Sequence, residues 1–247
     1  MRRGRLLATT IVFAAACAAA GKNSGSGDDQ PTPDAKGTDS NGLGTDAAVT
    51  IDGPPADAAP MMITMSQNTG ATIGSASSIA CGNNADGTTA ENSWYRVFKL
   101  VDHGIAGPLS VTSVAFGVQE ATGLPNVQVK IGTYSGNVTP PPAQLDTALV
   151  TPITAATFAV PNTASTATMT VNVPILATVP ANAQMIVEVF SPNQLGTGKY
   201  FYLGGNALGE SKPGYLRAPG CTTPQPKTTA ALGFPTSNLV ITVSGTM

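Results

Sequence analysis

The stretch Asn92–Leu100 reads NSWYRVFKL and contains the only tryptophan of this 247-residue chain. It is also the first dense apolar and aromatic run after a long polar N-terminal region. Successive side chains of an extended strand point to opposite faces. One face of this stretch therefore carries a single charge among large apolar side chains, and consists of Trp94, Arg96, Phe98 and Leu100. The stretch predicts a strand at which a folded domain acquires its core.

A second run, Gln184–Ser191, repeats this pattern with Glu188 between two large apolar residues. An unpaired charge that faces a core costs several kcal/mol. If both mixed faces point inward, Arg96 and Glu188 are expected to form a buried ion pair. If both point outward, Trp94 and Phe98 form an exposed platform that could stack sugars or hold a partner protein.

The same two interpretations apply to other aromatic residues. Tyr215 and Arg217 share one face of a predicted strand, and Tyr200–Tyr202 is a run of three aromatic side chains. These residues either fill the core and close the edge of the fold, or they form a ligand surface. Sequence patterns alone leave the two alternatives open.

From residue 61 onward the chain shows short apolar alternations bounded by Gly, Pro, Asn and Thr, and no sustained apolar period of 3.6 residues. The candidate strands are Met61–Met65, Trp94–Leu100, Val111–Gln119, Val127–Tyr134, Thr157–Val160, Thr168–Ile175, Gln184–Ser191, Tyr200–Gly204, Gly214–Ala218 and Asn238–Ser244. This pattern predicts an all-β, antiparallel β-sandwich over residues 61–247, jelly-roll-like, with an immunoglobulin-like Greek key as the alternative. Strict alternation in several strands predicts sheets with one solvated face.

The N-terminal segment 1–20 has the organisation of an export signal. Three arginines precede the apolar stretch Leu6–Ala16, and small residues follow it. The apolar stretch is shorter than the ~20 residues that span a bilayer, so it predicts a signal peptide rather than a membrane helix. Ala14–Cys17 resembles a lipobox, which predicts lipidation of Cys17. Ordinary cleavage after Ala20, with Cys17 discarded, is the alternative.

Residues 21–60 contain no aromatic residue and hold seven of the fourteen acidic residues. Such a composition cannot bury enough apolar surface to offset the entropy of ordering, so it predicts a disordered linker. Signal and linker together predict an exported lipoprotein at the outer membrane or cell surface of a Gram-negative bacterium, with the lipid as its only membrane contact. A secreted protein is the alternative.

With Cys17 lipidated or removed, Cys81 and Cys221 remain in the domain. Export permits oxidation, so these two cysteines are expected to form a disulfide. Two inert buried thiols are the alternative.

The domain from residue 61 onward carries seven acidic and seven basic residues. A formally neutral domain lacks the positive surface that nucleic acid requires, so nucleic acid is excluded as a partner. The loop 82–92 gathers oxygen donors, among them Asp86 and Glu91, that are suited to calcium, although it lacks the spacing of a known calcium loop. A solvated turn is the alternative, and no other cofactor is predicted.

No motif of a known enzyme class occurs in the sequence. His103 is the only histidine, and it follows Asp102 directly. Adjacent residues of an extended chain point to opposite faces, so the two do not form the aspartate–histidine arm of a catalytic triad. The chain is therefore expected not to be an enzyme. The alternative is an unrecognised hydrolase in which two carboxylates face each other across a cleft.

Five blocks of sequence together resemble an uncharacterised bacterial extracellular domain. They are NSWYRVF, SVAFGV, VPANAQMIVEVFSP, FYLGGNALGESKPGYLRAPGC and ALGFP, within about Thr64 to Thr246. The resemblance implies an accessory β-sandwich that is also found appended to secreted peptidases, with no assigned catalytic residue or ligand. It also implies that Cys221 pairs with an upstream cysteine.

These observations predict a surface-tethered, non-enzymatic domain for adhesion or for binding a glycan or protein. The alternative is an accessory domain that assists secreted hydrolases. Because no peptidase module precedes the domain in this sequence, such a hydrolase is expected to be a separate chain.

Overall fold

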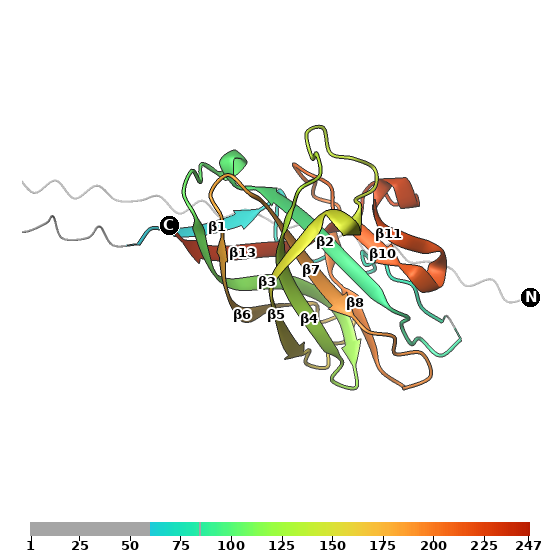
Figure 1. Ribbon diagram of the computed structural model, residues 1–247. Coiled ribbons are helices and arrows are strands. Elements are labelled where there is room, and N and C mark those ends of the chain that lie inside the picture. The colour runs from blue at the N-terminus through green and yellow to red at the C-terminus, as the bar shows by residue number, and fades with distance from the viewer. Residues whose placement is uncertain (1–59, 84) are drawn as a thin grey trace, which may run out of the picture. The chain divides into compact units, whose positions relative to one another are not determined.

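Strand β2 (Asn92–Lys99) lies inside the larger of two antiparallel sheets in the computed structural model, which describes residues 60–83 and 85–247 (Figure 1). The predicted signal peptide, Cys17 and nearly all of the predicted linker lie outside the described residues. The larger sheet has the order β11 (Thr223–Thr228), β10 (Tyr215–Ala218), β2, β7 (Gln184–Ser191), β4 (Asn126–Tyr134) and β5 (Val150–Ala159). The smaller sheet has the order β1 (Met62–Ser66), β13 (Ile241–Thr246), β3 (Leu109–Thr122) and β6 (Met169–Val179), and β8 (Tyr200–Leu203) pairs with β3.

The strand order defines a jelly roll. The smaller sheet runs β1-β13-β3-β6 and the larger one contains β2-β7-β4-β5, so β13 takes the place of the eighth strand. All strand pairs in the two sheets are antiparallel. The predicted antiparallel sandwich is confirmed, and its connectivity is that of two interlocked Greek keys rather than of an immunoglobulin domain.

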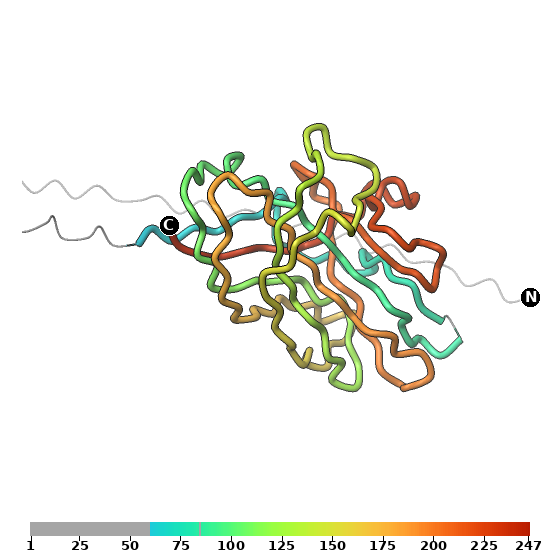
Figure 2. Tube along the Cα trace, in the orientation of Figure 1, coloured from blue at the N-terminus to red at the C-terminus, as the bar shows by residue number. Residues whose placement is uncertain are grey.

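The segment 192–240, between β7 and β13, is an addition to the eight-strand jelly roll. It supplies β8, β10 and β11, and also the small sheet of β9 (Gly205–Asn206) and β12 (Asn238–Leu239). Its trace, orange to red in Figure 2, gathers on the side of the domain away from the C-terminus.

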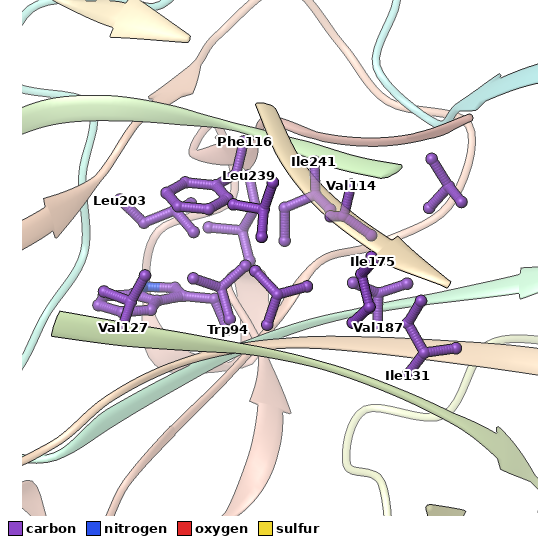
Figure 3. Packing of buried hydrophobic residues seen from close by; sticks show 14 of the residues in the cluster. Trp94, Val114, Phe116, Val127, Ile131, Ile175, Val187, Leu203, Leu239 and Ile241 are labelled. Atoms are coloured by element: carbon purple, nitrogen blue, oxygen red, sulfur yellow. The ribbon is translucent and has the colours of Figure 1, made fainter. Parts of the chain in front are cut away.

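The core lies between the two sheets and is organised around Trp94 (Figure 3). Trp94 is completely buried, its ring meets the ring of Phe201 edge to face at 5.5 Å, and its Nε1 donates a hydrogen bond of 2.8 Å to the Ile79 carbonyl. Phe201 on β8 in turn contacts Phe116 on the neighbouring strand β3 of the smaller sheet, with ring centroids 5.8 Å apart. Edge-to-face aromatic pairs add to the free energy gained by apolar burial. The NSWYRVFKL stretch thus provides the centre of the core.

The outer face of β2 is also buried, which the sequence pattern does not indicate. A second apolar cluster covers this face and consists of Tyr95, Val97, Tyr134, Val138, Leu145, Ile186 and Tyr215. Val138 and Leu145 belong to the connection between β4 and the short 3-10 helix η2 (Thr147–Leu149). This connection folds over the larger sheet, so the expectation of a solvated face does not hold at β2.

Two strands depart from the predicted pattern because they contain proline. Strand β11 has Pro224 and Pro226 and was not expected, and β5 contains Pro152 and starts seven residues before the predicted strand at Thr157. Both strands lie at the edges of the larger sheet, where a residue without an N–H is tolerated.

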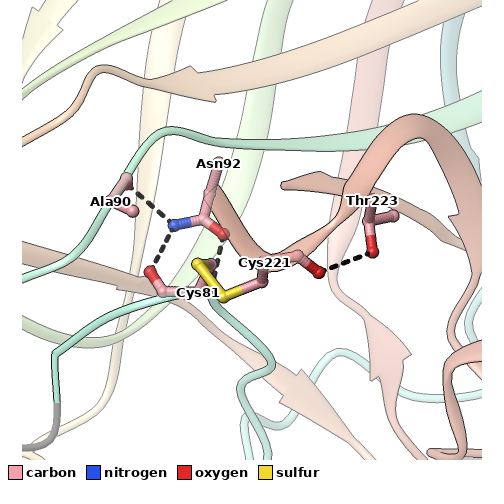
Figure 4. Close-up of a disulfide and its surroundings, with 5 residues drawn as sticks. All are labelled: Cys81, Ala90, Asn92, Cys221 and Thr223. Carbon is pink, nitrogen blue, oxygen red and sulfur yellow. Dashed lines mark hydrogen bonds between the residues drawn. A yellow bond between two sulfur atoms is a disulfide. The ribbon is translucent and has the colours of Figure 1, made fainter. Parts of the chain in front are cut away.

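The disulfide between Cys81 and Cys221 joins the loop before β2 to the 3-10 helix η3 (Pro219–Cys221), with Cα atoms 5.8 Å apart (Figure 4). The buried amide of Asn92 holds the same loop. Its Oδ1 accepts from the Cys81 N–H at 2.7 Å, and its Nδ2 donates to the carbonyls of Cys81 and Ala90. The predicted pairing of the two cysteines is confirmed.

Replacing both cysteines by alanine is expected to lower the free energy of unfolding by about 5 kcal/mol, because the bond closes a 140-residue loop. Denaturant unfolding of the variant and of the wild type, each with and without reductant, measures this loss. Reductant is expected to leave the variant unchanged. Equal stabilities of oxidised wild type and variant would contradict the expectation.

Candidate functional site

Arg96 is the only charged residue among those described that is fully buried. Its guanidinium forms an ion pair of 2.8 Å with Glu210 and donates to the carbonyls of Lys212 and Leu239. Burial lowers the pKa of Arg96, and the neighbouring Glu210 opposes that change. The charge therefore stays in the core because its donors are satisfied.

The predicted ion pair between Arg96 and Glu188 is wrong. Glu188 lies opposite Tyr95 in the register of β2 and β7, so it points to the outer face, whereas Arg96 points inward. On the outer face Glu188 pairs with Lys130 at 3.2 Å. The two mixed faces therefore point in opposite directions, a combination that neither sequence interpretation included.

Arg96→Met is expected to lower the free energy of unfolding by about 3–5 kcal/mol, because it leaves the Glu210 carboxylate and two carbonyls without their donor. Lys130→Met is the matched control, since it removes a partly exposed pair, and it is expected to cost about 1 kcal/mol or less. Urea unfolding of the two variants makes the comparison. Equal losses would show that the Arg96 pair is no more important than a surface pair.

Three of the four residues predicted to form a ligand surface are buried. Trp94 and Phe98 are 0% exposed and belong to the core, so they offer no platform. Tyr215 is 2% exposed and packs in the second apolar cluster. Arg217 is partly exposed, but its guanidinium pairs with Glu91 at 2.6 Å. The exposed-platform hypothesis is therefore wrong for the NSWYRVFKL stretch.

Strand β8 carries two aromatic side chains that reach the surface. Phe201 points into the core, and Tyr200 and Tyr202, on either side of it, point outward and are half-buried. Their rings lie 5.7 Å apart at an interplanar angle of 56°. Alternation along one strand therefore divides the run Tyr200–Tyr202 between core and surface.

The two tyrosines border a hollow of about 510 Å³, named here the tyrosine shelf. It is lined by Ala76, Ser78, Asp86, Gly87, Gln119, Glu120, Tyr200 and Tyr202. A second hollow of about 320 Å³ adjoins the other side of Tyr200 and includes Glu120 and Asn162. Tyr200 thus stands between two shallow depressions on the outer side of β3 and β8.

Hydrogen bonds fix the orientation of both phenols on the tyrosine shelf. The Tyr200 hydroxyl donates to Glu120 Oε1 at 2.9 Å, and the Tyr202 hydroxyl donates to the Gly87 carbonyl at 3.2 Å. Gly87 has a φ of 72°, a conformation that glycine adopts without strain. Partial burial, together with Glu120, raises the pKa of Tyr202, so its phenol stays protonated.

A local irregularity of β3 places Glu120 on this surface. The register between β3 and β8 shifts between Val118 and Glu120. At the shift, the side-chain carbonyl of Gln119 accepts from the N–H groups of Ser77 and Ser78 at 2.7 and 2.6 Å. Bulges of this kind re-aim side chains next to functional sites. The sequence gives no signal for the shift.

The two predicted calcium ligands are engaged in separate contacts. Asp86 accepts from the N–H and the hydroxyl of Thr88, which lower its pKa, whereas the Glu91 carboxylate pairs with Arg217. Within residues 60–83 and 85–247, no group of three or more His, Cys, Asp or Glu side chains is arranged to hold a metal ion. No helix in the same part of the chain is long and apolar enough to cross a membrane.

The comparisons with known proteins assign the chain to no family. No family model and no curated protein matches the sequence. Among solved structures, the chain is similar to the cysteine protease and lectin-like domains of Cwp84, a surface layer associated protein of Clostridium difficile. The identity is 14% and the TM-score 0.43, over 64% of this chain and 33% of that one.

A structure of the clostridial cysteine protease Cwp84 after propeptide cleavage gives 13% identity and a TM-score of 0.48, over 75% of this chain and 40% of that one. The chain thus spans a third to two fifths of the proteins it matches.

Tyr215 provides a test of the second apolar cluster. Burial raises the pKa of its phenol to about 12 from 10.0, so the folded protein holds this proton more tightly than the unfolded chain. The resulting stability is fully present below pH 10 and is lost as the pH rises toward 12, by about 2–3 kcal/mol. Tyr215→Phe is expected to reduce this loss, measured as free energy of unfolding between pH 9 and 12. Identical pH slopes for variant and wild type would contradict the burial of the phenol.

Proposed function

We propose that the domain is a non-catalytic glycan-binding module and that the tyrosine shelf is its binding surface. The observation that supports this function is the pair of outward tyrosines on β8, oriented by hydrogen bonds and bordered by two carboxylates. Aromatic faces pack against the C–H groups of a sugar ring, and carboxylates accept hydrogen bonds from its hydroxyls. The shelf combines both kinds of contact over a shallow area.

The shape of the surface favours a chain of sugars over a single small ligand. The two hollows on either side of Tyr200 are open and share Glu120, which belongs to the lining of both. An extended oligosaccharide could pass from one hollow to the other over the Tyr200 ring. Sites for compact ligands are usually enclosed cavities that bury most of the ligand.

The proposed location is the outside of the cell. The disulfide between Cys81 and Cys221 favours an oxidising compartment. We further propose that the signal segment exports the chain and that a lipid on Cys17 holds it at the envelope. Binding in support of a separate secreted hydrolase is the second role compatible with the same surface, because a module that holds a glycan also brings an enzyme to it.

The test is a glycan array followed by calorimetry with the best array ligand, using wild type, Tyr200→Ala and Tyr202→Ala. Each variant is expected to weaken binding by about tenfold, which corresponds to ~1.4 kcal/mol. Phe234→Ala is the matched control, since it removes an aromatic ring that is 49% exposed and lies outside both hollows. Unfolding curves of all variants verify that they fold. Array binding that survives both tyrosine substitutions would refute the shelf as the site.

A further inference from the structure

A cavity of about 200 Å³, separate from the two hollows beside Tyr200, lies on the larger sheet and shares no lining residue with the tyrosine shelf. It is located where β10 begins beside β2, between the segment 211–213 and the loop that carries Val138. Its apolar lining is formed by Val97, Val138, Pro141, Pro213 and Tyr215. The cavity is smaller than the roughly 300–1,000 Å³ of sites for drug-sized ligands, so it suits a group of about the size of one amino acid.

The charged residues around this cavity leave one cation free. Lys212 pairs with Asp102 at 3.6 Å, whereas Lys99 has no ion pair within the described residues. His103 also lines the cavity, and burial lowers its pKa, so it is neutral near pH 7. The apolar cavity therefore has an unpaired ammonium group among its lining residues.

A buried amide of the cavity lining has an open hydrogen-bond acceptor. Gln67 is 3% exposed and donates from Nε2 to the Val97 carbonyl at 2.6 Å, but its Oε1 has no partner in the described structure. The short bond to a carbonyl fixes which end of the amide is the nitrogen. A buried acceptor without a partner is destabilising, and a donor on a ligand would satisfy it.

We propose that this cavity binds a small amphipathic carboxylate, with its apolar body against Val97, Val138 and Tyr215 and its carboxylate at Lys99. A ligand that also carries an N–H group gains a bond to Gln67. This chemistry is shared by free acids with an aliphatic body and by the carboxyl-terminal residue of a peptide. The site is independent of glycan binding at the tyrosine shelf.

The experiment is a titration of the full chain, followed by NMR, with N-acetyl-leucine and with N-acetyl-leucinamide, which lacks the carboxylate. The acid is expected to bind with a Kd on the order of 1 mM, as small fragments do, and about tenfold more tightly than the amide. Lys99→Met is expected to abolish this difference. Lys227→Met, which removes a lysine outside the cavity, is expected to preserve it.

Val138→Phe fills the cavity and is expected to weaken binding of both probes by tenfold or more. Hexanoate and a leucine-terminated pentapeptide then distinguish the two sources of the ligand. Stronger binding of the peptide identifies a chain end, and equal binding identifies a free acid. The proposal is overturned if N-acetyl-leucine shows no saturable binding up to 20 times the expected Kd, if acid and amide bind alike, or if Val138→Phe, shown to be folded by its NMR spectrum, binds normally.

Discussion

The guanidinium of Arg96 connects segments that are distant in the sequence. It pairs with Glu210 and donates to the carbonyls of Lys212 and Leu239, and Asn68 Oδ1 lies 3.4 Å from one of its nitrogens. Arginine carries five donors in one rigid plane, so a single side chain can satisfy several fixed acceptors at once. The chain before β10 and the Leu239 backbone are thereby fixed against the inner face of β2, so this one cation joins two parts of the added segment 192–240 to the larger sheet.

That added segment also contributes to both candidate sites. The tyrosine shelf takes Tyr200 and Tyr202 from β8, whereas the apolar cavity takes Lys212, Pro213 and Tyr215 from the approach to β10. The eight strands of the jelly roll supply the rigid support beneath them. Functional residues on connections that a sheet scaffold positions are common in proteins. The two candidate sites lie on different sheets, and their lining residues differ in chemistry.

The sequence predicts the strands whose apolar and polar residues alternate strictly. It does not predict a contact between side chains that are distant in the sequence. The alternation of Val127, Val129 and Ile131 places all three in the core, as expected. The partner of Arg96 was not predictable, because Glu210 lies in a loop 114 residues away without a periodic pattern. The division of the run Tyr200–Tyr202 between core and surface follows from alternation, but only the fold determines which side faces out. The shelf itself depends on the register shift between Val118 and Glu120, and no residue type at these positions predicts such a shift.

The first and last strands of the domain lie side by side, and this has a mechanical consequence. Strand β1 pairs with β13 through five register pairs from Met62 to Ser66. Next to these pairs, the backbones of Met61 and Met247 exchange two hydrogen bonds. Figure 1 shows β1 entering on the side of the domain away from β8. A pull on β1 along its own axis therefore loads all five pairs together, in shear. Rupture in shear requires more force than peeling, so the pairing of β1 with β13 resists a pull applied at the N-terminal end of the domain.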